Sequence, residues 1–266
     1  MMSPYSYTVN CSILLTHLPL LERPHAVRDA GFNAVEFWWP FDSAVPGDRE
    51  VDEFVRAVSD AGVTLSHLNF VAGNLAAGDR GLLSDPRRAS EFRDNVDVVV
   101  GIGEQLGASG FNALYGNRID GVAPAIQDEL ATENLVLAAE AAARIGACVL
   151  LEPVSGFPAY PLKLARDAAR VIDRVGAPNI GLLADLYHLA ANGEDIPSAI
   201  ARFNAHIRHV QIADAPGRGA PGTGELPLTD YLSQICETGY DGYVSLEYVS
   251  SSADPFAWLP RDGFAG

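Results

Sequence analysis

One pattern recurs along this chain: a helix-like segment ends at a glycine, and a short apolar run follows it. The pattern occurs at Gly31, Gly62, Gly146, Gly176 and Gly239. Glycine after a helix accepts the left-handed conformation that ends the helix, and a short apolar run is typical of a strand buried on both faces. Strict alternation of helix and buried strand predicts a parallel sheet covered by helices.

Eight such runs are predicted to be strands, at residues 8–14, 34–39, 63–70, 110–116, 147–152, 179–185, 206–214 and 243–248. Apolar residues at helical spacing predict helices between them, at about 18–30, 51–62, 85–106, 123–145, 164–175, 196–203 and 228–239. The third helix gives the clearest pattern, with Asp85 as its cap and Pro86 in its first turn.

Eight strands alternating with seven or more helices favour a (β/α)8 barrel over an open doubly wound sheet. The chain has only 266 residues, and no GxGxxG motif follows the first strand. We therefore expect an α/β fold with one domain over residues 1–266. Its core covers about 8–250, and the tail at 251–266 can add only a short helix.

Composition narrows the class of function. The net charge of −16 opposes binding to a phosphate backbone, so we expect no nucleic-acid partner. The three cysteines have no CxxC spacing, which favours a reducing compartment. Residues 1–12 lack the pattern of a signal peptide, and the apolar stretch at 135–151 is interrupted by Glu140 and Arg144. We expect a cytoplasmic protein without a membrane partner. The sequence does not decide between a monomer and a homo-oligomer.

Four consecutive predicted strands end in an oxygen-bearing side chain: Glu152, Asp185, Gln211 and Glu247. In a (β/α)8 barrel the carboxyl ends of the strands meet at one face, where reactive groups lie. Three unpaired carboxylates there would repel one another and raise their pKa values, which a divalent cation would prevent. Oxygen ligands favour Mg²⁺ or Mn²⁺ over zinc. Each residue alone could instead form an ion pair, a helix cap or a backbone contact.

Further candidates surround these strand ends. His188 follows Asp185 by three residues, and Arg218 lies in a Gly/Pro-rich loop where it could bind an anion. Asn69 and Asn112 at strand ends are weaker candidates for contacts with substrate. Glu36 could be a structural partner or a ligand. Three aromatic residues could line a pocket or pack beneath a loop: Trp38, Trp39 and Phe41.

The chain resembles the hydroxypyruvate isomerase family of xylose isomerase-like TIM barrels over about residues 10–248. The matching segments are NCSILLTHLPLLER, AGFNAVEFWWPFD, LNFVAGNLAAGDRG, FNALYG, LLEP, ADLYH, HVQIADAPGRGAPGTGE and GYDGYVSLEY. Two segments depart from the family pattern, namely Asn74, where the family has an acidic residue, and residues 155–161 after LLEP. Both are expected to border the substrate rather than the metal.

The resemblance implies a metal bound by Glu152, Asp185, Gln211 and Glu247, with Glu152 and Glu247 as the acid/base pair. It also implies that His188 and Arg218 contact substrate. The expected reaction is the metal-dependent interconversion of hydroxypyruvate and tartronate semialdehyde through an enediolate. The alternatives are a ketose 3-epimerase, an isomerase of a four-carbon keto acid, and a non-catalytic sensor of sugar acids. DNA cleavage would need a His-rich zinc cluster and a basic groove, and only six histidines and a net charge of −16 argue against it.

Overall fold

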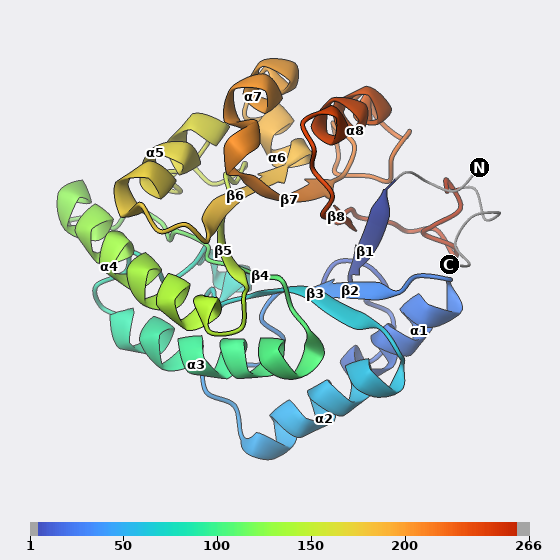
Figure 1. The fold of residues 1–266 in the computed structure, drawn as a ribbon, viewed down its shortest axis with the longest axis horizontal. Helices are drawn as coiled ribbons and strands as arrows, with labels where there is room; N and C mark the ends of the chain where they lie inside the picture. Colours follow the sequence, from blue (N-terminus) through green and yellow to red (C-terminus); the bar gives the residue numbers. More distant parts are fainter. Residues whose placement is uncertain (1–4, 260–266) are drawn as a thin grey trace.

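The computed structural model describes residues 5–259, and its strands close into a barrel (Figure 1). All neighbouring strands pair in parallel and in chain order, and the last strand pairs with the first. The strands are β1 (Ser6–Asn10), β2 (Ala34–Phe37), β3 (Thr64–Asn69), β4 (Gly110–Asn112), β5 (Cys148–Leu151), β6 (Ile180–Asp185), β7 (Ile207–Ile212) and β8 (Tyr243–Leu246). The predicted (β/α)8 barrel is confirmed.

Helices surround the barrel on its outside (Figure 1). They are α1 (Arg23–Asp29), α2 (Asp48–Asp60), α3 (Ala89–Leu106), α4 (Pro124–Ala143), α5 (Ala165–Val175), α6 (Leu186–Ala191), α7 (Ile196–Phe203) and α8 (Leu228–Glu237). Three short 3-10 turns accompany them, at Leu20–Glu22, Leu75–Ala77 and Asn204–His206. The predicted alternation of helix and strand is therefore observed from β1 to β8.

The glycines that suggested this alternation end the helices as expected. All five have positive φ angles, between 67° and 95°. At the end of α5, Gly176 is left-handed and its N–H donates to the carbonyl of Ile172 at 2.9 Å. An L-residue with a side chain rarely adopts this conformation, so glycine marks these boundaries in the sequence.

Three details differ from the sequence predictions. The third helix begins at Ala89, and Asp85 does not cap it. The carboxylate of Asp85 instead accepts from the backbone N–H and the guanidinium of Arg87, which fixes a turn before the helix. The short helix α6 follows β6 directly and was not predicted. In the described part of the tail, residues 251–259, the chain forms bends and turns, and no helix is present there.

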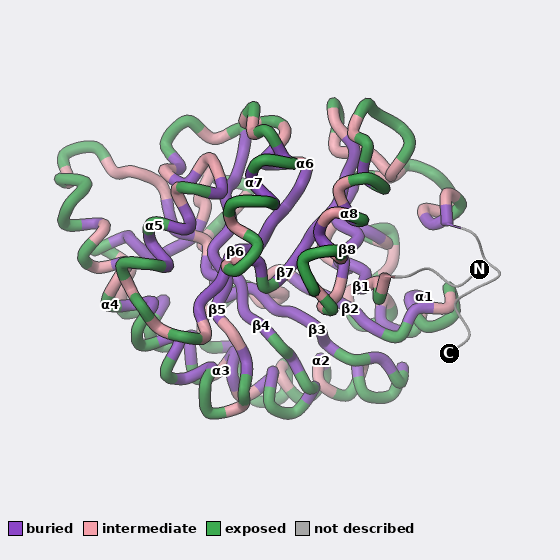
Figure 2. Tube along the Cα trace, turned by 45° about the horizontal axis from the view of Figure 1, so that its top comes forward, coloured by how far each residue is buried: buried purple, intermediate pink, exposed green. Residues whose placement is uncertain are grey.

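The core has two layers, one inside the barrel and one between barrel and helices. The strands are buried along most of their length (Figure 2). The predicted apolar face of α3 is buried, and a Cβ added at Gly103 would collide with the ring of Phe111 on β4. Inside the barrel, by contrast, polar side chains are buried near the strand ends, and these residues form the site.

Among residues 5–259, no helix combines the length and the apolar character that crossing a membrane requires.

Candidate active site

The four predicted side chains lie at the carboxyl end of the barrel and are almost fully buried. Their exposed fractions are 6% for Glu152, 1% for Asp185, 2% for Gln211 and 3% for Glu247. Asp185 and Gln211 are register partners on adjacent strands, and Gln211 Nε2 donates to Glu247 Oε2 at 2.5 Å. The strands therefore bring together the residues whose positions in the sequence suggested a common site.

Glu152 follows β5 and is held at both ends. Its carboxylate accepts a 2.7 Å hydrogen bond from Asn112 Nδ2, and its backbone carbonyl accepts from the hydroxyl of Tyr160 at 2.9 Å. Burial raises the pKa of Glu152 to about 8, and the neighbouring Asp185 carboxylate adds to this shift. Burial also raises the pKa of Glu247 well above its ordinary value, although Arg218 opposes the shift. A carboxylate whose pKa lies near 8, as for Glu152, has a proton affinity suited to acid/base catalysis near neutral pH.

His188 lies in the first turn of α6, where Asp185 Oδ1 caps the helix by accepting from the His188 N–H. The imidazole Nδ1 accepts from the backbone N–H of Ser155 at 3.1 Å, so the neutral ring carries its proton on Nε2. Burial lowers the pKa of His188 to about 4, which keeps the ring neutral. Nε2 lies 3.9 Å from Glu152 Oε1 and 3.7 Å from Asp185 Oδ2. The ring therefore directs a donor toward the carboxylates.

Arg218 reaches the site from the loop after β7. Its Nη2 lies 2.5 Å from Glu247 Oε1 and 3.5 Å from Asp185 Oδ2. Its backbone has a φ of 56°, which is uncommon for a residue with a side chain. The buried Asp214 holds this loop by accepting from the N–H groups of Ala215, Gly222 and Leu226. The loop thus fixes a guanidinium over the carboxylates.

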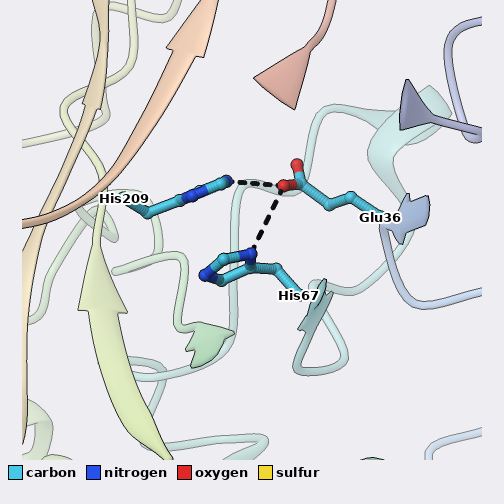
Figure 3. A group of neighbouring side chains, drawn as sticks. All are labelled: Glu36, His67 and His209. Atoms are coloured by element: carbon cyan, nitrogen blue, oxygen red, sulfur yellow. Dashed lines mark hydrogen bonds and ion pairs between the residues drawn. The ribbon is translucent and has the colours of Figure 1, made fainter. Parts of the chain in front are cut away.

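A second cluster lies beside these groups, formed by Glu36, His67 and His209 (Figure 3). The rings of His67 and His209 stack with centroids 3.6 Å apart. Glu36 Oε2 lies 2.5 Å from His209 Nε2 and 3.9 Å from His67 Nδ1. Burial opposes ionisation of Glu36, but His209, His67 and Gln211 outweigh it and lower the pKa of Glu36 to about 2. Glu36 is thus an anion inside the barrel.

A cavity of about 160 Å³ opens onto the site. Glu152, His188, Arg218 and Glu247 line it, together with Trp38, Asn69, Leu75, Arg80, Leu114, Val154 and Phe157. Arg80 stacks on the ring of Phe157 at 3.4 Å from its centroid, and its Nη1 donates to the carbonyl of Leu75. The cavity therefore combines two buried carboxylates with two guanidinium groups.

The donor set fits a divalent cation. Glu152 and Asp185 bring ligand oxygens within 4.8 Å of each other, next to the imidazole of His188. Among the described residues, Gln211 Oε1 and Asp185 Oδ2 are buried oxygens that accept no hydrogen bond, although Asp185 Oδ2 lies 3.5 Å from Arg218 Nη2. A buried acceptor without a hydrogen bond is costly, and coordination to a cation would satisfy both oxygens. The arrangement is compatible with a divalent metal site.

The weaker sequence candidates take different places. Asn69 lines the cavity, whereas Asn112 supports Glu152 from beneath and is absent from the lining. Trp38 lines the cavity, whereas Trp39 packs against Phe41 with centroids 5.0 Å apart. The three aromatic residues thus divide between the two roles considered.

Of the two departures from the family pattern, residues 155–161 reach the cavity through Phe157, whereas Asn74 is not a lining residue and only its neighbour Leu75 is. The side chain of Asn74 itself caps the turn Leu75–Ala77 by accepting from the Ala77 N–H at 3.0 Å. Sequence reasoning did not single out Arg80, although a cation within the glycine-bearing loop after β3 was visible.

Comparisons with known proteins agree with this fold. Residues 24–262 match the family model described as xylose isomerase-like TIM barrel. The chain is 54% identical over 265 residues to the "Putative hydroxypyruvate isomerase" of Streptomyces coelicolor, covering 96% of this chain and 95% of the relative. It is 32% identical to the hydroxypyruvate isomerase of Escherichia coli, covering 91% and 92%. It is 35% identical to the 2-oxo-tetronate isomerase of Cupriavidus necator, again covering 91% and 92%.

Among solved structures, a crystal structure described as an AP endonuclease of family 2 from Brucella melitensis superposes with a TM-score of 0.87. It is 32% identical and covers 96% of this chain and 97% of that chain. The structure of an L-ribulose 3-epimerase superposes with a TM-score of 0.72 at 23% identity, covering 92% and 82%, and supports the fold alone. The chain belongs to the xylose isomerase-like TIM barrel family, and within it to the group of the hydroxypyruvate isomerases.

Proposed function

We propose that this isomerase interconverts hydroxypyruvate and tartronate semialdehyde. The observation that carries the proposal is the cavity itself, where Glu152 and Glu247 face the same small space as Arg80 and Arg218. Two carboxylates suit the transfer of a proton between adjacent carbons, and guanidinium groups suit a substrate that bears a carboxylate. The names of the curated relatives, hydroxypyruvate isomerase and 2-oxo-tetronate isomerase, support the same class of reaction.

The residues that would hold the cation are Glu152, Asp185, Gln211 and Glu247, and their oxygens favour Mg²⁺ or Mn²⁺. When bound, such a cation polarises a carbonyl oxygen and stabilises the negative charge that develops on it. Gln211 Oε1 and Asp185 Oδ2, which accept no hydrogen bond from the described residues, support this assignment. His188, with its Nε2 proton directed at the carboxylates, would donate to an oxygen of the substrate.

The proton transfers assign roles to the two glutamates. One glutamate removes a proton from the hydroxymethyl carbon of hydroxypyruvate, which breaks that C–H bond and leaves an enediolate. The other returns a proton to the former carbonyl carbon, and the hydroxyl proton passes from one oxygen to the other. The product is tartronate semialdehyde, with no change in atoms or electrons. Arg218, held by Glu247, would contact the substrate while the transfers take place.

The nearest alternatives use the same pair of glutamates on a larger substrate. A ketose 3-epimerase or an isomerase of a four-carbon keto acid needs a longer cavity but the same acid/base chemistry. The small cavity and the two guanidinium groups favour a short acid over an uncharged ketose. DNA cleavage is disfavoured by the net charge of −16, and a binding protein would have little use for two carboxylates of raised pKa.

The three cysteines, Cys11, Cys148 and Cys236, are all free, which supports a cytoplasmic location. Exposed apolar side chains on α4, Ile126, Val136 and Leu137, are compatible with a homo-oligomer. The small-molecule substrate is the partner that the site itself supports.

The test is incubation of Mn²⁺- or Mg²⁺-loaded protein with hydroxypyruvate in D₂O, followed by proton NMR. We expect tartronate semialdehyde to form, EDTA to stop the reaction, and added cation to restore it. The Glu247→Gln variant should fold but lose turnover by about 10²- to 10⁴-fold, the usual contribution of a general acid or base. Unchanged turnover in this variant would contradict the role of Glu247. Deuterium entering hydroxypyruvate without product would indicate a longer substrate.

A further inference from the structure

Both carboxylate oxygens of Glu36 accept hydrogen bonds inside the barrel. Glu36 is not one of the residues that line the cavity. Its Oε1 accepts from Asn10 Nδ2 at 2.9 Å and from Gln211 Nε2 at 2.5 Å. Its Oε2 accepts from His209 Nε2 at 2.5 Å, and the stacked ring of His67 restrains that imidazole. Only 1% of Glu36 is exposed, so these contacts replace water entirely.

The same two amides also bind Glu247. Asn10 Nδ2 donates to Glu247 Oε2 at 2.8 Å, and Gln211 Nε2 donates to the same oxygen at 2.5 Å. Each NH₂ group thus uses one hydrogen on Glu36 and the other on Glu247. The amides of Asn10 on β1 and Gln211 on β7 therefore join the carboxylate of Glu36 on β2 to that of Glu247, which follows β8.

This arrangement determines which way the amides face. An ionised carboxylate can only accept hydrogen bonds, so an amide beside it must present its NH₂ group rather than its oxygen. With its nitrogen held by two carboxylates, Gln211 turns its Oε1 away from both. That oxygen is buried and has no hydrogen-bond partner. Asn10 likewise turns its oxygen away, toward the N–H of Ser12.

We propose that Glu36 is a positioning residue that sets the orientation of the Gln211 amide, so that the oxygen of Gln211 stays available to a divalent cation. The inference rests on the proposed function, in which Gln211 is a ligand. Glu36 touches neither substrate nor cation and acts only through Gln211 and Asn10. Outer partners of this kind orient ligands, and their loss typically weakens metal affinity about 10- to 100-fold.

The experiment is a double-mutant cycle read out as Mn²⁺ affinity by electron paramagnetic resonance. Glu36→Gln should weaken binding about 10- to 100-fold, because the new amide can donate where only an acceptor stood. Gln211→Glu alone should also weaken binding, because it places two carboxylates against each other at the present 2.5 Å contact. The double variant reverses donor and acceptor at this contact, while the new carboxylate at position 211 still faces Glu247 Oε2. It should therefore bind Mn²⁺ more tightly than Gln211→Glu alone.

The decisive feature is the sign of the effect of Glu36→Gln on Mn²⁺ affinity. The substitution should weaken binding in the original protein and strengthen it in the Gln211→Glu background. If Glu36 acted only through its charge, Gln211→Glu would tighten binding in both backgrounds. If Glu36 only supported the fold, Glu36→Gln would weaken binding in both backgrounds. Thr8→Val is the matched control: it removes the 2.7 Å contact with Ser66 inside the same barrel, and it should leave Mn²⁺ affinity unchanged.

Each outcome has a separate meaning. Failure of the original protein to bind Mn²⁺ would overturn the proposed metal site and this inference together. Tight binding by both the original protein and Glu36→Gln, or additive effects in the cycle, would overturn the role of Glu36 alone. If Glu36→Gln does not fold, as judged by circular dichroism, the double variant decides. Tighter Mn²⁺ binding by the double variant than by Gln211→Glu then supports the role, and equal or weaker binding overturns it.

Discussion

Replacing Glu152 by glutamine should stabilise the metal-free protein while it removes activity. The carboxyl group of Glu152 has a pKa of about 8 in the folded protein, against an ordinary value of 4.5. Since the folded state binds this proton more tightly than the unfolded state, the stability linked to it is complete below pH 4.5. That stability is lost as the pH rises toward 8. Glutamine is neutral at every pH and avoids this loss.

The size of the effect follows from the difference between the two pKa values. At 1.36 kcal/mol per pKa unit, the raised pKa of Glu152 lowers the stability of the folded state relative to the unfolded state by about 3 kcal/mol at pH 7 and about 5 kcal/mol by pH 9. Glu152→Gln should therefore raise the free energy of unfolding by up to these amounts. The hydrogen bond from Asn112 can persist, because the amide oxygen of glutamine can accept it.

The assay is urea unfolding of both proteins in EDTA at pH 5, 7 and 9. The stability difference should widen as the pH increases, with m-values unchanged. The surface variant Glu133→Gln is the control, since this glutamate is largely exposed, and it should change stability by less than about 0.5 kcal/mol. Added Mn²⁺ should stabilise the original protein more than the variant. A difference that is independent of pH, or a destabilised variant at pH 9, would refute the reasoning.

Two further variants test the cavity and its support. Arg80→Gln should raise KM for hydroxypyruvate and so lower kcat/KM about 10- to 100-fold. This is the effect of losing one charge-assisted hydrogen bond to the substrate carboxylate. The KM for dihydroxyacetone, which has a hydroxymethyl group in place of the carboxylate, should not change; equal effects on both compounds would exclude this role. Tyr160→Phe should cost about 2–4 kcal/mol in urea unfolding, because the buried hydroxyl accepts from the Tyr115 N–H and donates to the Glu152 carbonyl. A loss below about 1 kcal/mol would show that water replaces the hydroxyl.

The architecture was predictable because the glycines indicate where helices end, and the spacing of apolar residues indicates which faces of the helices and strands are buried. The strand ends were less predictable, since an apolar run does not show where pairing stops. The run at 110–116, for example, contains a strand of three residues, Gly110–Asn112. The cap at Asp85 was wrong because an Asp-Pro pair is equally compatible with a turn. In the folded chain Arg87 occupies its carboxylate.

The four residues at the ends of β5 to β8 were predictable because topology alone brings the carboxyl ends of parallel strands together. Asn10 was missed for the opposite reason. The first strand was predicted over residues 8–14, which placed Asn10 in its interior, whereas β1 ends at Asn10. A boundary error of four residues thus hid a side chain that donates to both Glu36 and Glu247. The sequence identified Glu36 as a candidate but did not assign its role, because that role depends on hydrogen-bond partners from β1 and β7. The order of the strands can be predicted from the sequence, but hydrogen bonds between side chains on opposite sides of the barrel are seen only in the folded structure.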